Sequence, residues 1–441
     1  MDNMCTKLTL ADFKKDEKII FFSSSTTHCG YYFMDLQQIH ALNHPEYPVK
    51  MINGGISGGS ARSGMERIEF DILAQKTDRV FISFGMNDVN YPLYYTAEPD
   101  ASNLAQREEA VENYRKYMIQ CIEALLAHQV KIVLVIPPPY DEYASAHAPV
   151  CGKGVNEKAL SRTAVITEEL AEKYQLPLID LFHPMLELIR GGTGILYSND
   201  RVHPNRSGQY VMTVLYLKTL NGTLDPVQAV LDARSGVIET CACKVKCISG
   251  TDELSFSFLP EHLPFLGDKD AMKKADALYP VSEFFGGEKL VVRNLSPGKY
   301  RLEDEKAECL GCFTAEELSE GIQLSELPTA NRKKAEKIRD ICSRLRLLQM
   351  KLRDAVMTRL MIKKLQECSS IAEEFSAVDE WLATKTGEGP YLYYKSVCES
   401  FKANRRVAEN IHAAIGKLQQ ELYKTAVPEE CMLTLKRADQ I

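Results

Sequence analysis

The stretch Lys18-Ile-Ile-Phe-Phe-Ser-Ser-Ser25 sets four consecutive apolar residues directly before three serines. A short apolar run bounded by polar residues is typical of a strand that is buried on both faces of a parallel sheet. Further runs of this kind follow in the first half of the chain, at Val49–Ile52, Arg79–Ser83, Lys131–Ile136 and Leu176–Asp180. The pattern predicts a parallel sheet whose first strand ends at a cluster of serines.

Helical patterns lie between these runs and after the last one. They cover Arg62–Lys76, Leu104–His128, Ala159–Tyr174 and Arg206–Leu220. Repeated alternation of strand and helix favours an α/β fold in which helices cover both faces of the sheet. We therefore expect a three-layer α/β domain over residues 1–222. Ligands of such sheets bind at the carboxyl ends of the strands, so residues that follow a strand are the first candidates for a site.

The pattern changes after about Leu224. Segments typical of strands alternate there with turns rich in Gly, Pro and Asp. The predicted strands are Thr240–Ser249, Glu253–Phe258, Lys289–Arg293 and Lys299–Leu302. This predicts a small, mainly β domain over residues 223–327.

Residues 328–441 are predicted to be helical. Ile338, Ile341 and Leu345 begin an apolar stripe with spacings of three and four, which marks one face of a helix. A break is expected at Thr386–Pro390, before a last helix over about Tyr391–Tyr423. The stripe would serve either self-association into a homo-oligomer or packing within the chain.

The stretch 331–364 is strongly basic. It holds twelve Lys or Arg and three acidic residues, a charge of +9, so the rest of a chain with net charge -7 carries -16. The basic helix would bind an anionic ligand or pack on the acidic remainder of the same chain, and we favour the second interpretation.

Composition limits the partners and the location. A net charge of -7 gives no reason to expect nucleic acid as a partner. The N-terminal residues lack the apolar core of a signal peptide, and no run approaches the ~18 apolar residues of a spanning helix. Thirteen cysteines without an export signal indicate free thiols in a reducing cytoplasm.

Five of the cysteines are spaced in a way that invites a metal site. Cys241, Cys243 and Cys247, with Cys309 and Cys312, offer thiolates of the kind that bind zinc. The first three also fit the alternation of a strand that buries small thiols. We favour buried thiols, and we expect neither a metal nor a cofactor.

The residues with catalytic chemistry follow the predicted strands. Ser25 comes directly after the first strand, and a serine hydroxyl needs a base within hydrogen-bond reach to become a nucleophile. His203 would be that base, and Asp200, three residues earlier, would hold the ring in the required tautomer. His28 is predicted to line the acyl pocket rather than to act as the base.

Two further blocks offer hydrogen-bond donors for an oxyanion. Asn53-Gly-Gly-Ile-Ser-Gly58-Gly follows the second strand, and its glycines let backbone N–H groups approach a substrate. Asn87, in Gly85-Met-Asn-Asp88, offers a side-chain amide after the third strand. With the N–H of Ser25, these groups would stabilise a tetrahedral intermediate.

With these blocks in view, residues 1–222 resemble the SGNH hydrolases, the GDSL-type esterase and lipase superfamily. The resemblance implies a flavodoxin-like α/β fold, with Ser25 as nucleophile, Gly58 and Asn87 as oxyanion donors, and Asp200 and His203 completing the triad. Residues 290–327 also resemble the tail of a bacterial subgroup, which suggests an appended β and helical region without chemistry of its own.

The chain departs from the family at the first block. Where the family has Gly-Asp-Ser, this sequence has Ser23-Ser24-Ser25. Either the site works with altered support, or the protein is a degenerate relative that binds a ligand without turning it over. We favour a working site, because every group with a direct chemical role is present.

The sequence therefore predicts a cytoplasmic, cofactor-free serine hydrolase with an acyl-enzyme on Ser25. The expected substrate is a small carboxylic ester, such as a short acyl ester or an O-acetylated carbohydrate. The loop over residues 137–154, with Tyr140, Tyr143 and His147, is expected to shape the substrate site.

Overall fold

The structure is a computed structural model that describes residues 8–96, 98–144, 154–248, 250 and 253–438. Its contacts divide the chain into two compact units of discontinuous pieces. The first unit comprises Met1–Gln37, Val49–Leu220 and Ser343–Gln419, and the second comprises Gln38–Pro48, Asn221–Cys342 and Gln420–Ile441. The domain boundaries expected near residues 222 and 327 stay predictions.

The first unit is built on a parallel sheet of five strands in the order β2-β1-β3-β4-β5. The strands are β1 (Lys18–Ser23), β2 (Lys50–Gly55), β3 (Arg79–Ser83), β4 (Lys131–Ile136) and β5 (Leu178–Asp180). This order is that of flavodoxin-like folds, whose ligands bind where the winding reverses between the first and third strands. The predicted α/β fold class is confirmed.

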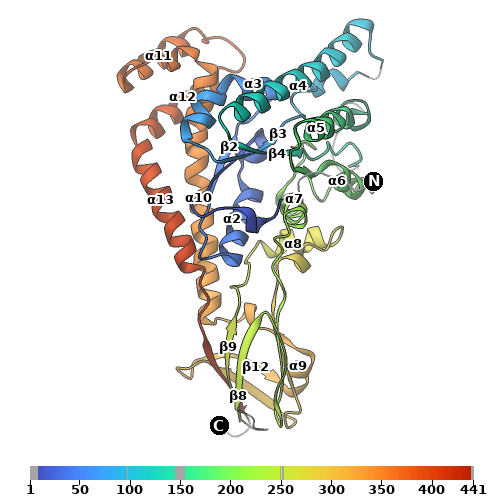
Figure 1. Ribbon diagram of the computed structural model, residues 1–441, viewed down its shortest axis with the longest axis vertical. Helices are drawn as coiled ribbons and strands as arrows, with labels where there is room; N and C mark the ends of the chain where they lie inside the picture. Colours follow the sequence, from blue (N-terminus) through green and yellow to red (C-terminus); the bar gives the residue numbers. More distant parts are fainter. Residues whose placement is uncertain (1–7, 97, 145–153, 249, 251–252, 439–441) are drawn as a thin grey trace. The chain divides into compact units, whose positions relative to one another are not determined.

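Helices cover both faces of this sheet (Figure 1). They are α1 (Ser25–His28), α2 (Tyr31–Asn43), α3 (Ala61–Arg67), α4 (Ala101–Ala127), α5 (Ser161–Tyr174), α6 (Phe182–Ile189) and α7 (Arg206–Thr219). Ile20 and Phe22 pack with side chains of α3, α4 and α5 on one face. On the other face Phe21 stacks on Phe33 of α2 and contacts Tyr216 of α7. Alternate residues of β1 thus enter two separate cores, as the period of a strand requires.

The outer edge of β2 is covered by two glutamine side chains. Gln37 of α2 accepts the N–H of Met51 and donates to the carbonyl of Val49. Gln349, far along the chain, accepts the N–H of Asn53 and donates to the carbonyl of Met51. Each side-chain amide therefore bonds the β2 backbone as a residue of a neighbouring parallel strand would. This satisfies an edge that would otherwise be open to pairing.

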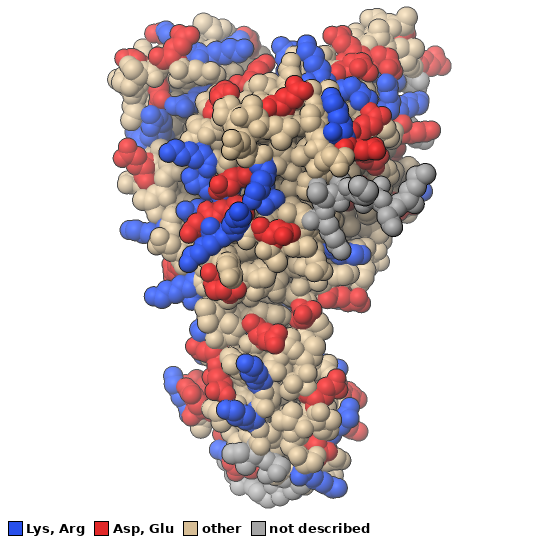
Figure 2. All heavy atoms as spheres, in the orientation of Figure 1, with Lys and Arg blue, Asp and Glu red and all other residues tan. Residues whose placement is uncertain are grey.

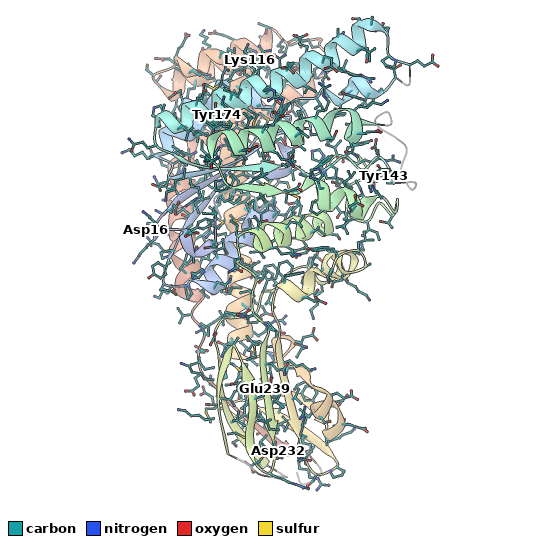
Figure 3. All side chains as sticks on the ribbon, turned by 45° about the vertical axis from the view of Figure 1, so that its right-hand side comes forward. Asp16, Lys116, Tyr143, Tyr174, Asp232 and Glu239 are labelled. Carbon is teal, nitrogen blue, oxygen red and sulfur yellow. The ribbon has the colours of Figure 1, made fainter. Side chains whose placement is uncertain are left out.

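The second unit contains two sheets around one apolar core. Four strands are ordered β13-β10-β6-β7 and five are ordered β12-β11-β14-β9-β8. Their bounds are β6 (Val227–Asp232), β7 (Gly236–Cys241), β8 (Cys243–Ile248), β9 (Glu253–Pro260), β10 (Glu288–Arg293), β11 (Lys299–Glu303), β12 (Cys309–Thr314), β13 (Ile322–Gln323) and β14 (Cys431–Arg437). Two short helices, α8 (Lys269–Asp276) and α9 (Ala315–Glu320), lie between strands. Figure 3 labels Asp232 and Glu239 on the neighbouring strands β6 and β7.

The last quarter of the chain is largely helical. Its helices are α10 (Ala330–Met361), α11 (Ile371–Ala383), α12 (Tyr391–Arg406) and α13 (Ala408–Thr425). The start of the predicted stripe, Ile338, Ile341 and Leu345, is buried. Basic side chains of α10 find acidic partners within their own unit, such as Arg353 with Asp71. Figure 2 accordingly shows basic and acidic side chains interspersed over the face in view.

Several elements differ from the sequence-based predictions. The single strand expected over Thr240–Ser249 is wrong, because Ala242 takes a positive φ of 48° and separates β7 from β8. The single helix expected over Tyr391–Tyr423 is interrupted at Val407, which divides it into α12 and α13. The region expected to be helical also ends in β14, which lies between β9 and β11.

The cysteine pattern follows the strands. Cys243 and Cys247 of β8 pack against the core of the second unit, as the alternation predicted. Cys241, Cys309 and Cys312 are exposed, so the expectation of buried thiols is wrong for these three. Among the described residues, no group of three or more His, Cys, Asp or Glu side chains is arranged to hold a metal ion. Within the same residues, none of the helices is both long and apolar enough to cross a lipid bilayer.

The aromatic stack on Phe21 gives a test of the core. Phe21 is 1% exposed, and its ring centroid lies 4.9 Å from that of Phe81 and 5.3 Å from that of Phe33. We expect Phe21→Ala to lower the free energy of unfolding by roughly 3–5 kcal/mol, because it leaves a cavity among packed rings. The matched variant Val165→Ala, on the exposed side of α5, should change it by less than about 0.5 kcal/mol. Equal effects in urea unfolding would contradict this packing.

Candidate active site

The three consecutive serines have different environments. Ser23 ends β1, and its hydroxyl donates to the carbonyl of Ser83 at 2.5 Å. Ser24 is the N-cap of α1 with an extended backbone, φ -98° and ψ -152°, and its side chain makes no capping bond. Ser25 is the first residue of α1 and lies directly after the carboxyl end of β1. The turn thus holds Ser25 without a positive φ at any of the three serines.

Ser25, His203 and Asp200 are brought together from distant parts of the chain. The Ser25 Oγ lies 2.6 Å from Nε2 of His203. Nδ1 of the same ring lies 2.7 Å from Oδ2 of Asp200. If Asp200 accepts the Nδ1–H, Nε2 is left with a lone pair that faces the serine hydroxyl. The side chains of His203 and Asp200 are 40% and 46% exposed, so a ligand can reach them from solvent.

The loop that carries this pair is fixed by its own side chains. The second carboxylate oxygen of Asp200 accepts the N–H groups of Val202 and His203 at 2.9 and 3.0 Å. Partial burial would raise the pKa of Asp200, but these N–H groups and the His203 ring hold it below its usual value. Asn205 caps α7 through Ser207 and Gly208 and donates to two carbonyls of the preceding loop. Asp200 therefore stays ionised and holds the imidazole ring in place.

The Gly58 and Asn87 loops are tied to each other. Asn87 donates one N–H of its amide to the carbonyl of Gly59 at 2.8 Å, which leaves the second N–H for another acceptor. The next residue, Asp88, accepts the N–H of Ala61 at 2.7 Å. Gly58 is exposed, with a φ of +72° that favours glycine and open space where a Cβ would lie. The loops after β2 and β3 thus form one hydrogen-bonded structure.

Gly55 has a structural role that the sequence did not reveal. A Cβ at this position would lie 2.3 Å from the backbone nitrogen of His28. Only glycine therefore lets the end of β2 pack against the turn that carries Ser25. The glycine run, expected to serve close approach of a substrate, also serves close approach of α1.

His28 lies beside the predicted oxyanion loop. Its Nδ1 accepts the backbone N–H of Ser57 at 3.2 Å and lies 3.0 Å from the Ser57 hydroxyl. Burial, helped by the positive charge of Arg353, lowers the pKa of His28. The ring is therefore neutral near pH 7 and can act as an acceptor. Its contact to Ser57 is a structural role that the sequence did not indicate.

The predicted substrate loop is only partly described. Tyr140 is fully buried, Tyr143 is 40% exposed (Figure 3), and His147 lies outside the described residues. Tyr140 contributes to a core with Phe182 and Val155 rather than to an open surface. Tyr143 remains a candidate for contact with a substrate.

Comparisons with known proteins found a matching family and a similar esterase. Residues 24–211 match the model of the GDSL-like Lipase/Acylhydrolase family. An acetylxylan esterase from Geobacillus stearothermophilus is 22% identical over 220 residues, which cover 46% of this chain and 94% of the esterase. The resemblance to GDSL-type hydrolases predicted from the sequence is confirmed.

One solved structure is similar over almost the whole chain. A gut microbial diltiazem-metabolizing enzyme matches with a TM-score of 0.84 at 22% identity, covering 98% of this chain and 100% of that one. At this identity the likeness shows the fold alone. It extends over the additional sheets and helices as well as the α/β part.

Asp88 gives a test of the site's electrostatics. Burial raises the pKa of this carboxyl to about 7, and its Oδ2 has no hydrogen-bond partner within the described residues. The folded protein keeps the proton up to about pH 7, whereas an unfolded chain releases it near pH 4. Wild-type stability should therefore fall, relative to Asp88→Asn, by about 3 kcal/mol between pH 5 and pH 8.

Urea unfolding at several pH values measures this difference. Asp340→Asn, which removes a carboxyl with a 71% exposed side chain, is the matched control and should follow the wild-type curve. A constant difference between wild type and Asp88→Asn across the pH range would show that Asp88 does not titrate there.

Proposed function

We propose that this chain, which carries a GDSL-like lipase/acylhydrolase domain, is a serine hydrolase that cleaves carboxylic esters through an acyl-enzyme on Ser25. The observation that carries the proposal is the pair of short contacts at His203, 2.6 Å to the Ser25 hydroxyl and 2.7 Å to the Asp200 carboxylate. These contacts connect a nucleophile, a base and an orienting acid, which are the groups that acyl transfer needs.

In the first half of the reaction, Ser25 Oγ attacks the ester carbonyl while His203 Nε2 takes the hydroxyl proton. Asp200 stabilises the imidazolium that forms. The oxyanion of the tetrahedral intermediate would be bound by the N–H groups of Ser25 and Gly58 and by the free N–H of Asn87. His203 then gives its proton to the leaving alcohol, and the acyl group stays on Ser25.

In the second half, His203 takes a proton from water, and the hydroxide attacks the acyl carbon. Collapse of the second intermediate breaks the bond to Ser25 Oγ, which recovers its proton from His203. The products are a carboxylic acid and a free enzyme. No residue outside this set is required to move a proton.

A small acyl group is the first to test. One cavity that borders Ser25 measures about 20 Å³, room for about one water molecule, and its lining includes Thr27, Tyr32 and Pro138. This lining does not include His203, Gly58 or Asn87, so the cavity does not set the length of the acyl group. The similarity to an acetylxylan esterase supports O-acetyl esters, including those of carbohydrates, as the substrates to test. The cytoplasmic location, the absence of nucleic-acid partners and the oligomeric state stay predictions.

The altered first block bears on whether the site turns over. Ser24 provides no carboxylate, yet Ser25 still faces His203 at hydrogen-bond distance. This geometry favours a working enzyme over a degenerate binding protein. The degenerate alternative would hold if Ser25 neither hydrolysed an ester nor reacted with an active-site phosphonate.

The first experiment is hydrolysis of p-nitrophenyl acetate by wild type, Ser25→Ala and His203→Ala. We expect both variants to lose at least about 1000-fold in kcat, because each removes a member of a unit that acts together. Ser24→Ala is the matched control for the serine. His183→Ala is the control for the histidine, because His183 forms a similar exposed pair with Asp180 at 2.9 Å.

Both controls should keep more than half of the wild-type rate. Activity that survived in Ser25→Ala or His203→Ala would contradict the assignment. If the wild-type protein instead hydrolysed neither the acetate nor the butyrate ester and left Ser25 unlabelled by a phosphonate, that result would favour the alternative of a degenerate, ligand-binding protein.

Asn87 is the side-chain donor in this scheme. Removing one such donor in another hydrolase costs about 100- to 1000-fold in kcat. We expect Asn87→Ala to lose kcat in that range with a smaller change in KM, because the donor acts on the transition state rather than the bound ester. Circular dichroism checks that the variant is folded. An unchanged kcat would remove Asn87 from the oxyanion site.

A further inference from the structure

A buried cluster of three charges lies behind the candidate site. It consists of Arg67 of α3, Asp71 just after that helix and Arg353 of α10. Their side chains are 0%, 1% and 4% exposed, respectively. Two nitrogens of Arg353 each lie 2.6 Å from an oxygen of Asp71, a bidentate ion pair across 282 positions of sequence. Arg67 pairs with the same carboxylate. Burial alone would raise the pKa of Asp71, but the two guanidinium groups bring it below its usual value.

The two arginines also bind backbone carbonyls at the ends of β1 and β2. Arg67 donates to Ser23 at 3.1 Å and to Gly54 at 2.8 Å. Arg353 donates through Nε to Gly55 at 3.0 Å. These carbonyls come directly before the turn of Ser25 and the loop of Gly58. The cluster thus joins the two segments from which the proposed nucleophile and oxyanion donor extend.

Other residues on the same face of α10 reach the same segments. Arg346 donates to the carbonyl of Cys29, at the end of the short helix that begins at Ser25. Gln349 bonds the backbone of Met51 and Asn53 in β2. Their spacing with Arg353, three and then four residues, places all three side chains on one face of the helix.

Asn53 continues this connection to the serine turn. Its side-chain amide donates to the carbonyl of His28 at 3.0 Å, and its Oδ1 accepts the N–H of Gly55. His28 in turn accepts the N–H of Ser57, the residue before Gly58. A chain of hydrogen bonds therefore runs from α10 through β2 to both loops of the site.

We propose that helix α10 is part of the catalytic scaffold, with Arg353 and Gln349 as positioning residues that fix the Ser25 turn relative to the Gly58 loop. This inference rests on the proposed function. It also explains how the altered first block is supported. The family's acid is replaced by Ser24, which makes no capping bond. Arg67 and Arg346 instead hold the two ends of the turn through the carbonyls of Ser23 and Cys29, and Arg353 holds the carbonyl of Gly55 at the end of β2 beside it.

By this inference, the segment that matches the family model lacks two residues that position the proposed site. That segment ends at residue 211, whereas Gln349 and Arg353 lie far beyond it. The α/β part would then need a helix from the last third of the chain to hold its site in a productive geometry. Small displacements of reacting groups have large effects on rate, about 100-fold for a misplacement of 1 Å.

Gln349→Met is the first variant for the test. It removes both hydrogen bonds to β2, keeps a similar volume and leaves no buried charge without a partner. We expect kcat for p-nitrophenyl acetate to fall roughly 10- to 100-fold while KM changes less than about threefold. The rate at which a fluorophosphonate reacts with Ser25 should fall in parallel, because it depends on the same nucleophile and oxyanion geometry.

Arg353→Lys is the second variant. Lysine keeps the positive charge beside Asp71 but cannot form the bidentate contact and reach Gly55 at once. We expect a loss of kcat similar to that of Gln349→Met. Arg359→Gln is the matched control, because Arg359 lies on the same helix and pairs with Glu374, which contacts neither loop of the site. It should lower the melting temperature without changing kcat per folded molecule.

The outcomes separate the two proposals. If wild type shows Ser25-dependent hydrolysis and Gln349→Met and Arg353→Lys keep its kcat and phosphonate reactivity, α10 is only structural and the inference is overturned. If both variants lose kcat and phosphonate reactivity while Arg359→Gln keeps them, the inference is supported. If wild type itself lacks Ser25-dependent hydrolysis and labelling, the proposed function fails, and the inference fails with it.

Discussion

The parallel register of β1 with its two neighbours is the constraint on which the candidate site depends. Ser23 pairs with Gly55 of β2 on one side and with Ser83 of β3 on the other, so all three strands end at the same level. The segments that follow carry Ser25, Gly58 and Asn87. A shift of one residue in either pairing would turn the side chains of that strand to the opposite faces and separate these groups.

Hydrogen bonds to side chains keep this edge of the sheet in place. The amides of Gln37 and Gln349 cover the open side of β2, and Arg67 and Arg353 bind the carbonyls where β1 and β2 end. Burying two arginines and one carboxylate is costly, and an ion cluster of this kind contributes less to stability than its contacts suggest. We infer that the cluster contributes here by fixing the positions of these carbonyls, which serves the candidate site more than the stability of the fold.

The structure brings together Ser25, His203 and Asp200, which the sequence had singled out, but the sequence did not indicate which residues support them. Ser25, Asn87 and His203 were identifiable because each follows a strand or lies in a short block with a chemical reason for its residue types. The pairing of Asp71 with Arg353 was not identifiable. An apolar stripe with charges beside it indicates that α10 is a helix, but it does not indicate which part of the chain that helix packs against. Strand β14 was missed for a similar reason, since its pairing with β9 and β11 depends on contacts distant in sequence.

The most direct test of the account is to find where an acyl group is held during turnover. Wild-type protein would be mixed with p-nitrophenyl acetate, quenched in acid within milliseconds and digested for peptide mass spectrometry. The account predicts one acetyl group on the peptide that contains Ser25. The fraction of the protein that carries this group should rise in a variant whose deacylation is slowed. Hydrolysis with the acetyl group on any other residue would contradict it.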